Sequence, residues 1–352
     1  MVIVNNRLTY DKDNTYISFY KFEESPEIMI KQGDVVFVKT GSTVGKVAYV
    51  DKLMCKTTLN PQLIVLKNIQ CDNYLLSVLM STSRFQNAIR KITVGGAVPT
   101  LSQAAMGDIA VTMPQVAEQE KLSKFISLLD KRIATQNKII EKYESLIKGL
   151  NDSLYQQYGN GIMTSFSELG QSYSGLSGKS ADDFGTGKPY ITYLNVYSNN
   201  VVNENDYQYV RISDGEKQNV VKYGDVLFTL SSETPEEVGV GSVYLGKGDV
   251  YLNSFCFGIH IENKELAYSP YLSYYVSSTP FRKFIYPFAQ GSTRFNLCKA
   301  DFEKANIMLP SLDNQKRIYS VLSRITIKIE TEKSMLEQYT TQKQYLLRQM
   351  FI

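Results

Sequence analysis

The side chains that could carry out chemistry are few, and the single histidine limits them most. His260 is the only histidine in 352 residues, and it lies in the alternating apolar run Phe257–Ile261, which predicts a β-strand. A histidine-rich metal site therefore cannot form, and a Ser-His-Asp triad would have to depend on this one residue. A hydrogen-bonded strand histidine is the favoured interpretation, and a catalytic histidine is the less favoured alternative.

The segment Gly41–Val47 imitates a nucleotide-binding loop but departs from it in two ways. Three residues separate its glycines where the nucleotide-binding loop has four, and Val47 replaces the Ser or Thr that binds magnesium. Apolar stretches at 34–39 and 46–50 predict strands on both sides, so no helix N-terminus is available for phosphates. A hairpin loop is predicted. No Gly-x-Gly-x-x-Gly motif opens a helix, and we expect neither a catalytic activity nor a cofactor.

The four cysteines form no Cys-x-x-Cys pair. A metal or redox site is therefore not expected, and these thiols are predicted to be buried or incidental. They are Cys55, Cys71, Cys256 and Cys298.

Several loops carry the basic and hydroxyl side chains that suit base edges and phosphates. Arg294 has the fork that fits guanine or a phosphate, and Asn296 has the amide that fits adenine. The net charge is only +3, so such binding would depend on local placement, and ordinary solvent-exposed loops remain the alternative. The predicted DNA-contacting residues are Lys39, Ser42, Thr43, Lys46 and Thr100 in the first half and Lys179, Ser180, Lys188, Thr293, Arg294 and Asn296 in the second.

The sequence contains an internal repeat, so loops of this kind occur at matching places in both halves of the chain. Gly33–Phe37 returns as Gly224–Phe228, a shift of 224 − 33 = 191 positions, and 85–119 returns as 281–315, a shift of 196. Each copy is a strand-rich arm followed by a helix-forming segment. The glycine-containing loops at 94–101 and 290–297 occupy matching places but differ in sequence, which favours two readers built on one scaffold.

The helix-forming segments carry a heptad pattern. Apolar residues recur at alternating steps of four and three along 122–154 and along 318–350. Gln136 and Glu332 fill corresponding polar slots, which indicates a layer that fixes the register of a helix pair. We expect an antiparallel coiled coil of roughly 50 Å with one arm at each end and a pseudo-twofold internal repeat. Two separate amphipathic helices, each docked on its own arm, are the alternative.

The chain resembles the specificity subunits of type I restriction-modification systems. The resemblance rests on the repeated Gly33–Phe37 and Gly224–Phe228 motifs, and on Met113-Pro114 and Leu309-Pro310, each leading to a Gln-containing helix start. It implies an α+β fold in which two small mixed β-rich target recognition domains are separated by a long antiparallel two-helix coiled coil. The expected domains are residues 1–114, 115–157, 158–311 and 312–352.

The resemblance implies a non-catalytic, cytoplasmic DNA-binding subunit. Its partners would be double-stranded DNA with a bipartite site, two methyltransferase subunits and motor-nuclease subunits. The second arm has an opening segment, 165–188, with no counterpart before residues 4–6, so the first target recognition domain is expected to be shortened at its start. A silent cassette, an assembly-only protein with one inactive arm, and a stand-alone methyltransferase or nuclease remain alternatives.

Overall fold

The computed structural model describes residues 1–352 except 1, 5, 10–13, 96–97, 160 and 351–352. It is a mixed helix-and-sheet structure, as expected from the sequence. The chain forms two compact units, unit 1 from Met1–Asn137 with Ser334–Ile352 and unit 2 from Lys138–Lys333. Each unit is described by itself.

Unit 1 is built on a five-stranded sheet in the order β1-β2-β5-β4-β7. The strand predictions at 34–39 and 46–50 are confirmed as β4 and β5. One face packs against α2 and α3 around the buried side chains of Val35, Phe37, Phe85 and Ile89. The elements are β1 (Val2–Val4), β2 (Arg7–Thr9), α1 (Phe19–Glu23), β3 (Met29–Ile30), β4 (Val35–Val38), β5 (Val47–Tyr49), β6 (Thr57–Thr58), β7 (Leu63–Leu66), α2 (Asn73–Met80), α3 (Ser83–Ile92) and α4 (Gln103–Gly107).

Unit 2 contains a four-stranded sheet in the order β14-β12-β16-β9, together with smaller sheets. The strand predicted at Phe257–Ile261 is confirmed as part of β16. Its elements are β8 (Ile162–Thr164), α6 (Phe166–Leu169), β9 (Gly170–Ser174), β10 (Phe184–Ile191), α7 (Tyr193–Ser198), β11 (Tyr207–Val210), β12 (Val226–Thr229), β13 (Ser231–Ser232), β14 (Gly241–Val243), β15 (Tyr251–Leu252), β16 (Cys256–Ile261), α8 (Ser269–Tyr275), α9 (Thr279–Ile285), β17 (Ala289–Gln290), β18 (Phe295–Leu297), α10 (Lys299–Lys304) and β19 (Ile307–Leu309).

The sequence repeat corresponds to a repeat of local structure. In unit 1, β4 pairs antiparallel with β5 and β7, and in unit 2, β12 pairs antiparallel with β14 and β16. The Tyr49 N–H donates to the Asn6 carbonyl at 2.8 Å, and the Val243 N–H donates to the Asn200 carbonyl at 3.0 Å. Asn6 and Asn200 therefore make equivalent backbone contacts in the two units.

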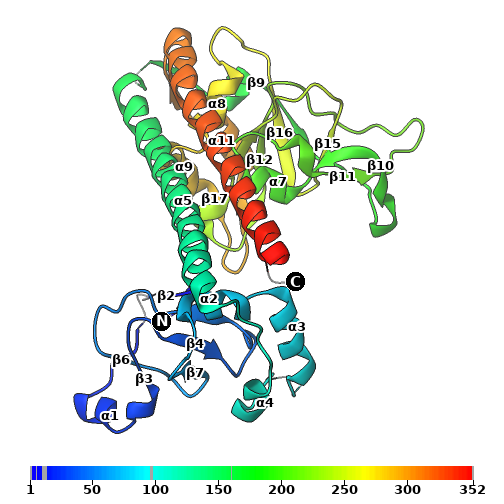
Figure 1. Cartoon of the computed structure of the whole chain (residues 1–352). Helices are drawn as coiled ribbons and strands as arrows, with labels where there is room; N and C mark the ends of the chain where they lie inside the picture. Colours follow the sequence, from blue (N-terminus) through cyan, green and yellow to red (C-terminus); the bar gives the residue numbers. More distant parts are fainter. Residues whose placement is uncertain (1, 5, 10–13, 96–97, 160, 351–352) are drawn as a thin grey trace. The chain divides into compact units, whose positions relative to one another are not determined.

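Two long helices cross the boundary between the units. They are α5 (Val116–Tyr158) and α11 (Leu312–Met350). In unit 1, Ile126 of α5 packs with Leu347 and Met350 of α11. In unit 2, Ile147, Leu150 and Leu154 of α5 pack in the same core as Ile318 and Leu322 of α11. The predicted helices are therefore present, and each unit holds a piece of both (Figure 1).

The first turn of each long helix is fixed by a repeated glutamine. The Gln119 amide oxygen accepts from the Asp72 N–H at 2.9 Å, and its NH₂ group donates to the Pro114 carbonyl at 2.8 Å. The Gln315 oxygen accepts from the Tyr268 N–H at 2.8 Å, and its NH₂ group donates to the Pro310 carbonyl at 2.8 Å. Asp72 and Tyr268 are the N-caps of α2 and α8. The glutamine thus joins a long helix to a short one in each unit.

None of the described helices is both long and apolar enough to cross a bilayer. All four cysteines are free, and only Cys256 is buried.

Candidate nucleic-acid interface

The segment Gly41–Val47 forms the turn between β4 and β5. Gly41 and Gly45 have φ angles of 104° and 94°, which favour glycine, and the Gly45 N–H donates to the Val38 carbonyl at 3.0 Å. The hairpin prediction is therefore confirmed. The turn passes from strand to strand without a helix that could receive a phosphate at its N-terminus.

A second loop is hydrogen-bonded to this hairpin. The Leu101 N–H donates to the Lys39 carbonyl at 2.8 Å, and the Gly41 N–H donates to the Pro99 carbonyl at 2.9 Å. Residues 96–97 of the predicted glycine loop lie outside the described residues. The rest of the two loops borders a hollow whose lining includes Lys39 and Thr100.

The first-half residues predicted to contact DNA all lie on these two loops. Ser42, Thr43, Lys46 and Thr100 are exposed, and Lys39 is half-buried. The two loops together therefore carry two amines and three hydroxyls. Such groups can donate to phosphate oxygens or to base edges.

In unit 2, the predicted Arg294 loop is the turn of the β17–β18 hairpin. Gly291 has a φ of 141°, and a Cβ there would lie 2.1 Å from the Arg294 carbonyl oxygen, so a side chain would not fit. The Arg294 guanidinium lies 6.0 Å from the centre of the exposed Phe255 ring, and Asn296 pairs with Ser231 across β18 and β13. The exposed predicted residues here are Thr293, Arg294 and Asn296.

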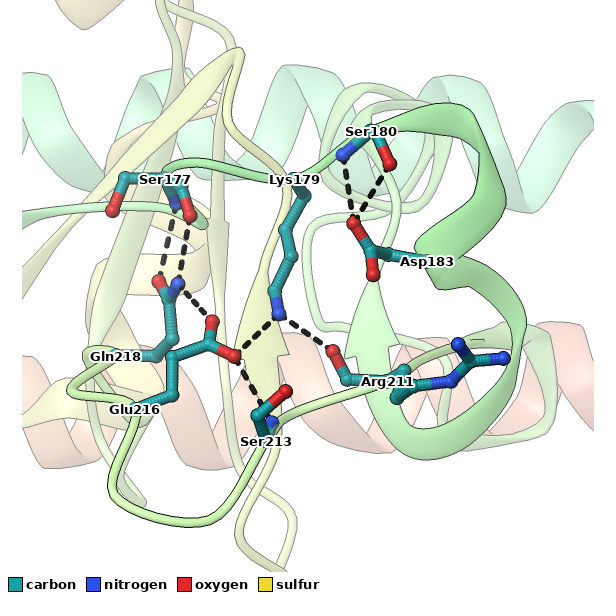
Figure 2. Close-up of polar contacts among 8 residues, drawn as sticks. All are labelled: Ser177, Lys179, Ser180, Asp183, Arg211, Ser213, Glu216 and Gln218. Atoms are coloured by element: carbon teal, nitrogen blue, oxygen red, sulfur yellow. Dashed lines mark hydrogen bonds and ion pairs between the residues drawn. The ribbon is translucent and has the colours of Figure 1, made fainter.

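Lys179 is held inside unit 2. Its Nζ donates to Glu216 Oε2 and to the Arg211 carbonyl, each at 2.6 Å, and the side chain is 8% exposed. Figure 2 shows the amine between these partners, with Ser213 and Gln218 beside the same carboxylate. Hydrogen bonds from Lys179, and then from Ser213 and Gln218, lower the pKa of Glu216 to about 2. The amine therefore organises a loop and has internal partners.

Ser180 also has a local partner. Its N–H and Oγ donate to Asp183 Oδ2 at 2.9 and 3.0 Å, and these bonds, backbone first, lower the pKa of Asp183. Lys188 is exposed on β10 and pairs with Val210 of β11. Lys179, Ser180 and Lys188 therefore lie along the segment that leads from the cluster in Figure 2 to the β10–β11 ribbon. This ribbon extends from the rest of unit 2 (Figure 1).

The ribbon carries aromatic residues that the sequence analysis did not select. Phe184 and Tyr209 are 39% and 49% exposed, and the Phe255 ring under Arg294 is 57% exposed. Exposed rings can stack on bases or support a cation. The alternating Gly185 and Gly187, both at positive φ, were the available signal for an irregular strand here.

The helix residues predicted to fix the register are both buried. Gln136 and Glu332 are each 6% exposed. Lys328 Nζ lies 2.5 Å from Glu332 Oε1 on the same helix. Both side chains are therefore buried, and their role in fixing the register of a helix pair stays a prediction.

His260 has a structural environment. Its Nδ1 lies 2.9 Å from the Asp225 carboxylate, and its ring stacks on Tyr173 with centroids 4.2 Å apart. The favoured interpretation, a hydrogen-bonded strand histidine, is confirmed. Among the described residues, no group of three or more His, Cys, Asp or Glu side chains could hold a metal ion.

A family model described as the Type I restriction modification DNA specificity domain matches residues 2–145 and 168–339. The Type I restriction enzyme MjaVIII specificity subunit of Methanocaldococcus jannaschii is 26% identical over 146 residues, or 42% of this chain. That alignment spans about a third, 33%, of the relative's own length.

Solved structures show a similar fold. The S subunit of the type I restriction-modification system from M. genitalium has a TM-score of 0.56 at 14% identity, over 91% of this chain and 83% of that one. A chain from a type I restriction-modification system, solved in work on complex assembly and conformational transition, has a TM-score of 0.57 at 16% identity, over 92% of this chain and 82% of that one.

Proposed function

The chain belongs to the type I restriction modification DNA specificity family, and from this premise we propose that it selects the DNA sequence for a type I restriction-modification complex. The observation that carries the proposal is the family match in both halves of the chain. We propose a non-catalytic cytoplasmic subunit that reads a bipartite site in double-stranded DNA, one half with each unit.

The proposed reading surface of unit 1 is the loop pair at 39–46 and 98–101. Lys39 and Lys46 would neutralise phosphates, and the hydroxyls of Ser42, Thr43 and Thr100 would position the loops or contact base edges. The support is that backbone hydrogen bonds hold the two loops together, so they present their side chains as one surface.

The proposed reading surface of unit 2 combines the Arg294 hairpin with the β10–β11 ribbon. Arg294 and Asn296 have the donor patterns that suit guanine and adenine, and Lys188 would contact a phosphate. We propose that Lys179 and Ser180 act indirectly, because Lys179 holds the Arg211 and Glu216 loop and Ser180 caps Asp183. Phe255 would keep the Arg294 guanidinium in place.

We propose that α5 and α11 form an antiparallel coiled coil that sets the spacing between the half-sites. Residues 122–154 would give a rod of roughly 50 Å at about 1.5 Å per residue, with Gln136 and Glu332 fixing its register. The helices would also dock two methyltransferase subunits, with motor-nuclease subunits joining through that complex. The domains at 1–114, 115–157, 158–311 and 312–352 and their pseudo-twofold arrangement are part of this proposal.

Methylome sequencing of cells that express this chain with its modification subunit tests the proposal. The expected result is one methylated bipartite motif with a fixed spacer. A double substitution of Arg294 and Asn296 by Ala should change or abolish selection of one half-site and leave the other half unaltered. Methylation without sequence preference, or methyl transfer by the purified chain alone, would refute the proposed role.

A second candidate is an assembly subunit in which only unit 2 reads DNA. It is favoured by one difference: unit 2 contains β8, α6 and β9, and no counterpart occurs among the described residues of unit 1. Footprinting of the complex with the modification subunits separates the two candidates. Protection of two half-sites supports the bipartite reader, and protection of one half-site supports the assembly subunit.

A further inference from the structure

Unit 2 encloses one of its own segments in an apolar groove. β8 pairs antiparallel with β19, with Ile162 opposite Leu309 and Thr164 opposite Ile307. In α6, which follows, Phe166 and Leu169 are each 0% exposed. The Phe166 ring lies 5.1 Å from Phe302 and 6.1 Å from Phe281, centre to centre. Residues 162–169 thus form an integral layer of the unit 2 core.

Unit 1 has the matching wall without this segment. By the repeat shift of 196, residues 111–113 correspond to β19, and no described residue forms a strand against them. Phe85 is 8% exposed where its counterpart Phe281 is 1% exposed. Met106 is 9% exposed where its counterpart Phe302 is 0% exposed. These two side chains of unit 1 are therefore slightly more exposed than their unit 2 counterparts.

A groove of about 350 Å³ lies at this place in unit 1. Its lining is mostly apolar, and the exposed Arg84 adds one cation. Arg84 has Pro280 as its counterpart in unit 2, so this charge belongs to the unit 1 groove alone. The lining includes Phe85, Ala88, Ile109, Val111, Met113 and Met350.

We propose that this groove binds an extended segment of a second polypeptide with the chemistry of Ile162–Leu169. Such a segment has an apolar strand residue at the position of Ile162, an aromatic residue at that of Phe166 and a leucine at that of Leu169. The carboxylate at the position of Glu168 stabilises the segment's own helical turn, because it accepts from the Ser165 N–H at 3.1 Å in unit 2. Strand pairing to residues 111–113 provides main-chain hydrogen bonds, and the groove receives alternate side chains. The proposal is independent of DNA reading.

The proposed segment stops at Leu169 because the next strand would not fit. In unit 2, β9 places Tyr173 over Gly258 of β16, where a Cβ would lie 2.2 Å from the ring. The register of β4 with β7 and of β12 with β16 puts Val65 at the place of Gly258. A valine there would collide with a ring placed as in unit 2, so the ligand is the β8–α6 part alone.

The test uses the full chain and a synthetic peptide with the sequence of residues 161–170, GIMTSFSELG. We expect saturable binding by fluorescence anisotropy and reduced hydrogen exchange at 109–113. A peptide with Phe166→Ala should bind about 30-fold more weakly, because a buried phenylalanine contributes about 2 kcal/mol. A protein with Val111→Lys should lose at least tenfold in affinity, about 1.4 kcal/mol.

Val94→Lys is the matched control, since Val94 is 75% exposed in unit 1 and does not line the groove; its affinity should be unchanged. Failure of the wild-type peptide to bind, or equal binding to the Val111→Lys and wild-type chains, would overturn the proposal. Protection of 109–113 without peptide in a protein that sediments as a monomer would also overturn the proposal, because this chain itself would then cover the groove.

Discussion

Two equivalent aspartates, Asp34 in unit 1 and Asp225 in unit 2, have different hydrogen-bond partners. In unit 1, Asp34 Oδ2 accepts from the Lys31 N–H and from Lys67 Nζ, each at 2.9 Å. In unit 2, Asp225 Oδ2 accepts from the Lys222 N–H at 2.8 Å and from the Tyr173 hydroxyl at 2.6 Å, and its Oδ1 faces His260 Nδ1 at 2.9 Å. Both carboxylates accept a hydrogen bond from a backbone N–H in the turn before a central strand. This bond is common to the two units, whereas the side-chain partners of the carboxylates differ.

The strand registers show why the partners can differ. Leu66 lies opposite Val35, and Ile259 lies opposite Val226, so Lys67 and His260 occupy equivalent positions at the ends of β7 and β16. Unit 1 uses a flexible lysine whose side chain is 35% exposed. Unit 2 uses a ring that stacks on the β9 tyrosine. The strand β9, which unit 2 has in addition, is therefore connected to the turn by the hydrogen bond from the Tyr173 hydroxyl to Asp225.

The largest effect is expected for Asp225→Ala. Burial, followed by the charge of Asp225, raises the pKa of Tyr173, so this hydroxyl keeps its proton and would lose its acceptor inside the protein. We expect a loss of about 4 kcal/mol in the stability of unit 2, against about 2 kcal/mol for Asp34→Ala in unit 1, where Lys67 can be hydrated. Urea unfolding with hydrogen exchange at β12 and β4 measures both. Tyr173→Phe is the control, at about 1 kcal/mol. Equal losses in the two units would refute the comparison.

Gly258→Val, which places the unit 1 residue in unit 2, should cost about 3 kcal/mol, because the added side chain overlaps the Tyr173 ring. That ring cannot move cheaply, since its hydroxyl is bonded to Asp225. Val65→Ala in unit 1 should cost about 1 kcal/mol, for the half-buried methyl groups removed. Thermal unfolding of the two variants provides the measurement. A stable Gly258→Val protein would mean that β9 can shift away from β16.

The repeated glutamines should differ less. Gln315 makes a third hydrogen bond, to the Leu266 carbonyl at 2.7 Å, and is 0% exposed, whereas Gln119 is 7% exposed. Gln315→Ala should therefore cost about 2 kcal/mol and Gln119→Ala about 1 kcal/mol. Hydrogen exchange at the first turns of α11 and α5 reports each loss separately. A reversed order would show that the two helix starts are not held in the same way.

The smallest effect concerns the Figure 2 cluster, which has no counterpart among the described residues of unit 1. The pKa of Glu216 falls from 4.5 to about 2, so its stabilisation of the loop is fully present above about pH 4.5 and is lost as the pH falls through 2. Hydrogen exchange at 213–218 should rise over this window. Glu216→Gln should remove the pH dependence. An unchanged pH profile in the variant would exclude Glu216 as its source.

Much of the fold could be predicted because it depends on local pattern. Heptad spacing predicted α5 and α11, an apolar stretch predicted β4, and an alternating apolar run predicted β16. The hairpin at 41–47 could be predicted because apolar stretches flank it on both sides. These features are encoded by residues close together in the chain.

The partners of side chains could not be predicted in the same way. Lys179 is of a residue type that commonly contacts DNA, but its amine is hydrogen-bonded to Glu216, 37 residues away. Asp225 and His260 are 35 residues apart and meet only because β12 and β16 pair. Phe255 and Tyr209 lacked a local signal, because the exposure of a ring depends on which strands cover it.

The division of the chain has a consequence for synthesis on the ribosome. Unit 2 is one continuous stretch, Lys138–Lys333, whereas unit 1 combines Met1–Asn137 with Ser334–Ile352. Nascent chains usually fold domain by domain from the N-terminus, but here the second unit can be completed first. In unit 1, Leu75, Val78 and Ile126 pack with Leu347 and Met350, which are translated after the whole of unit 2. The core of unit 1 can therefore be completed only after unit 2 has been synthesised.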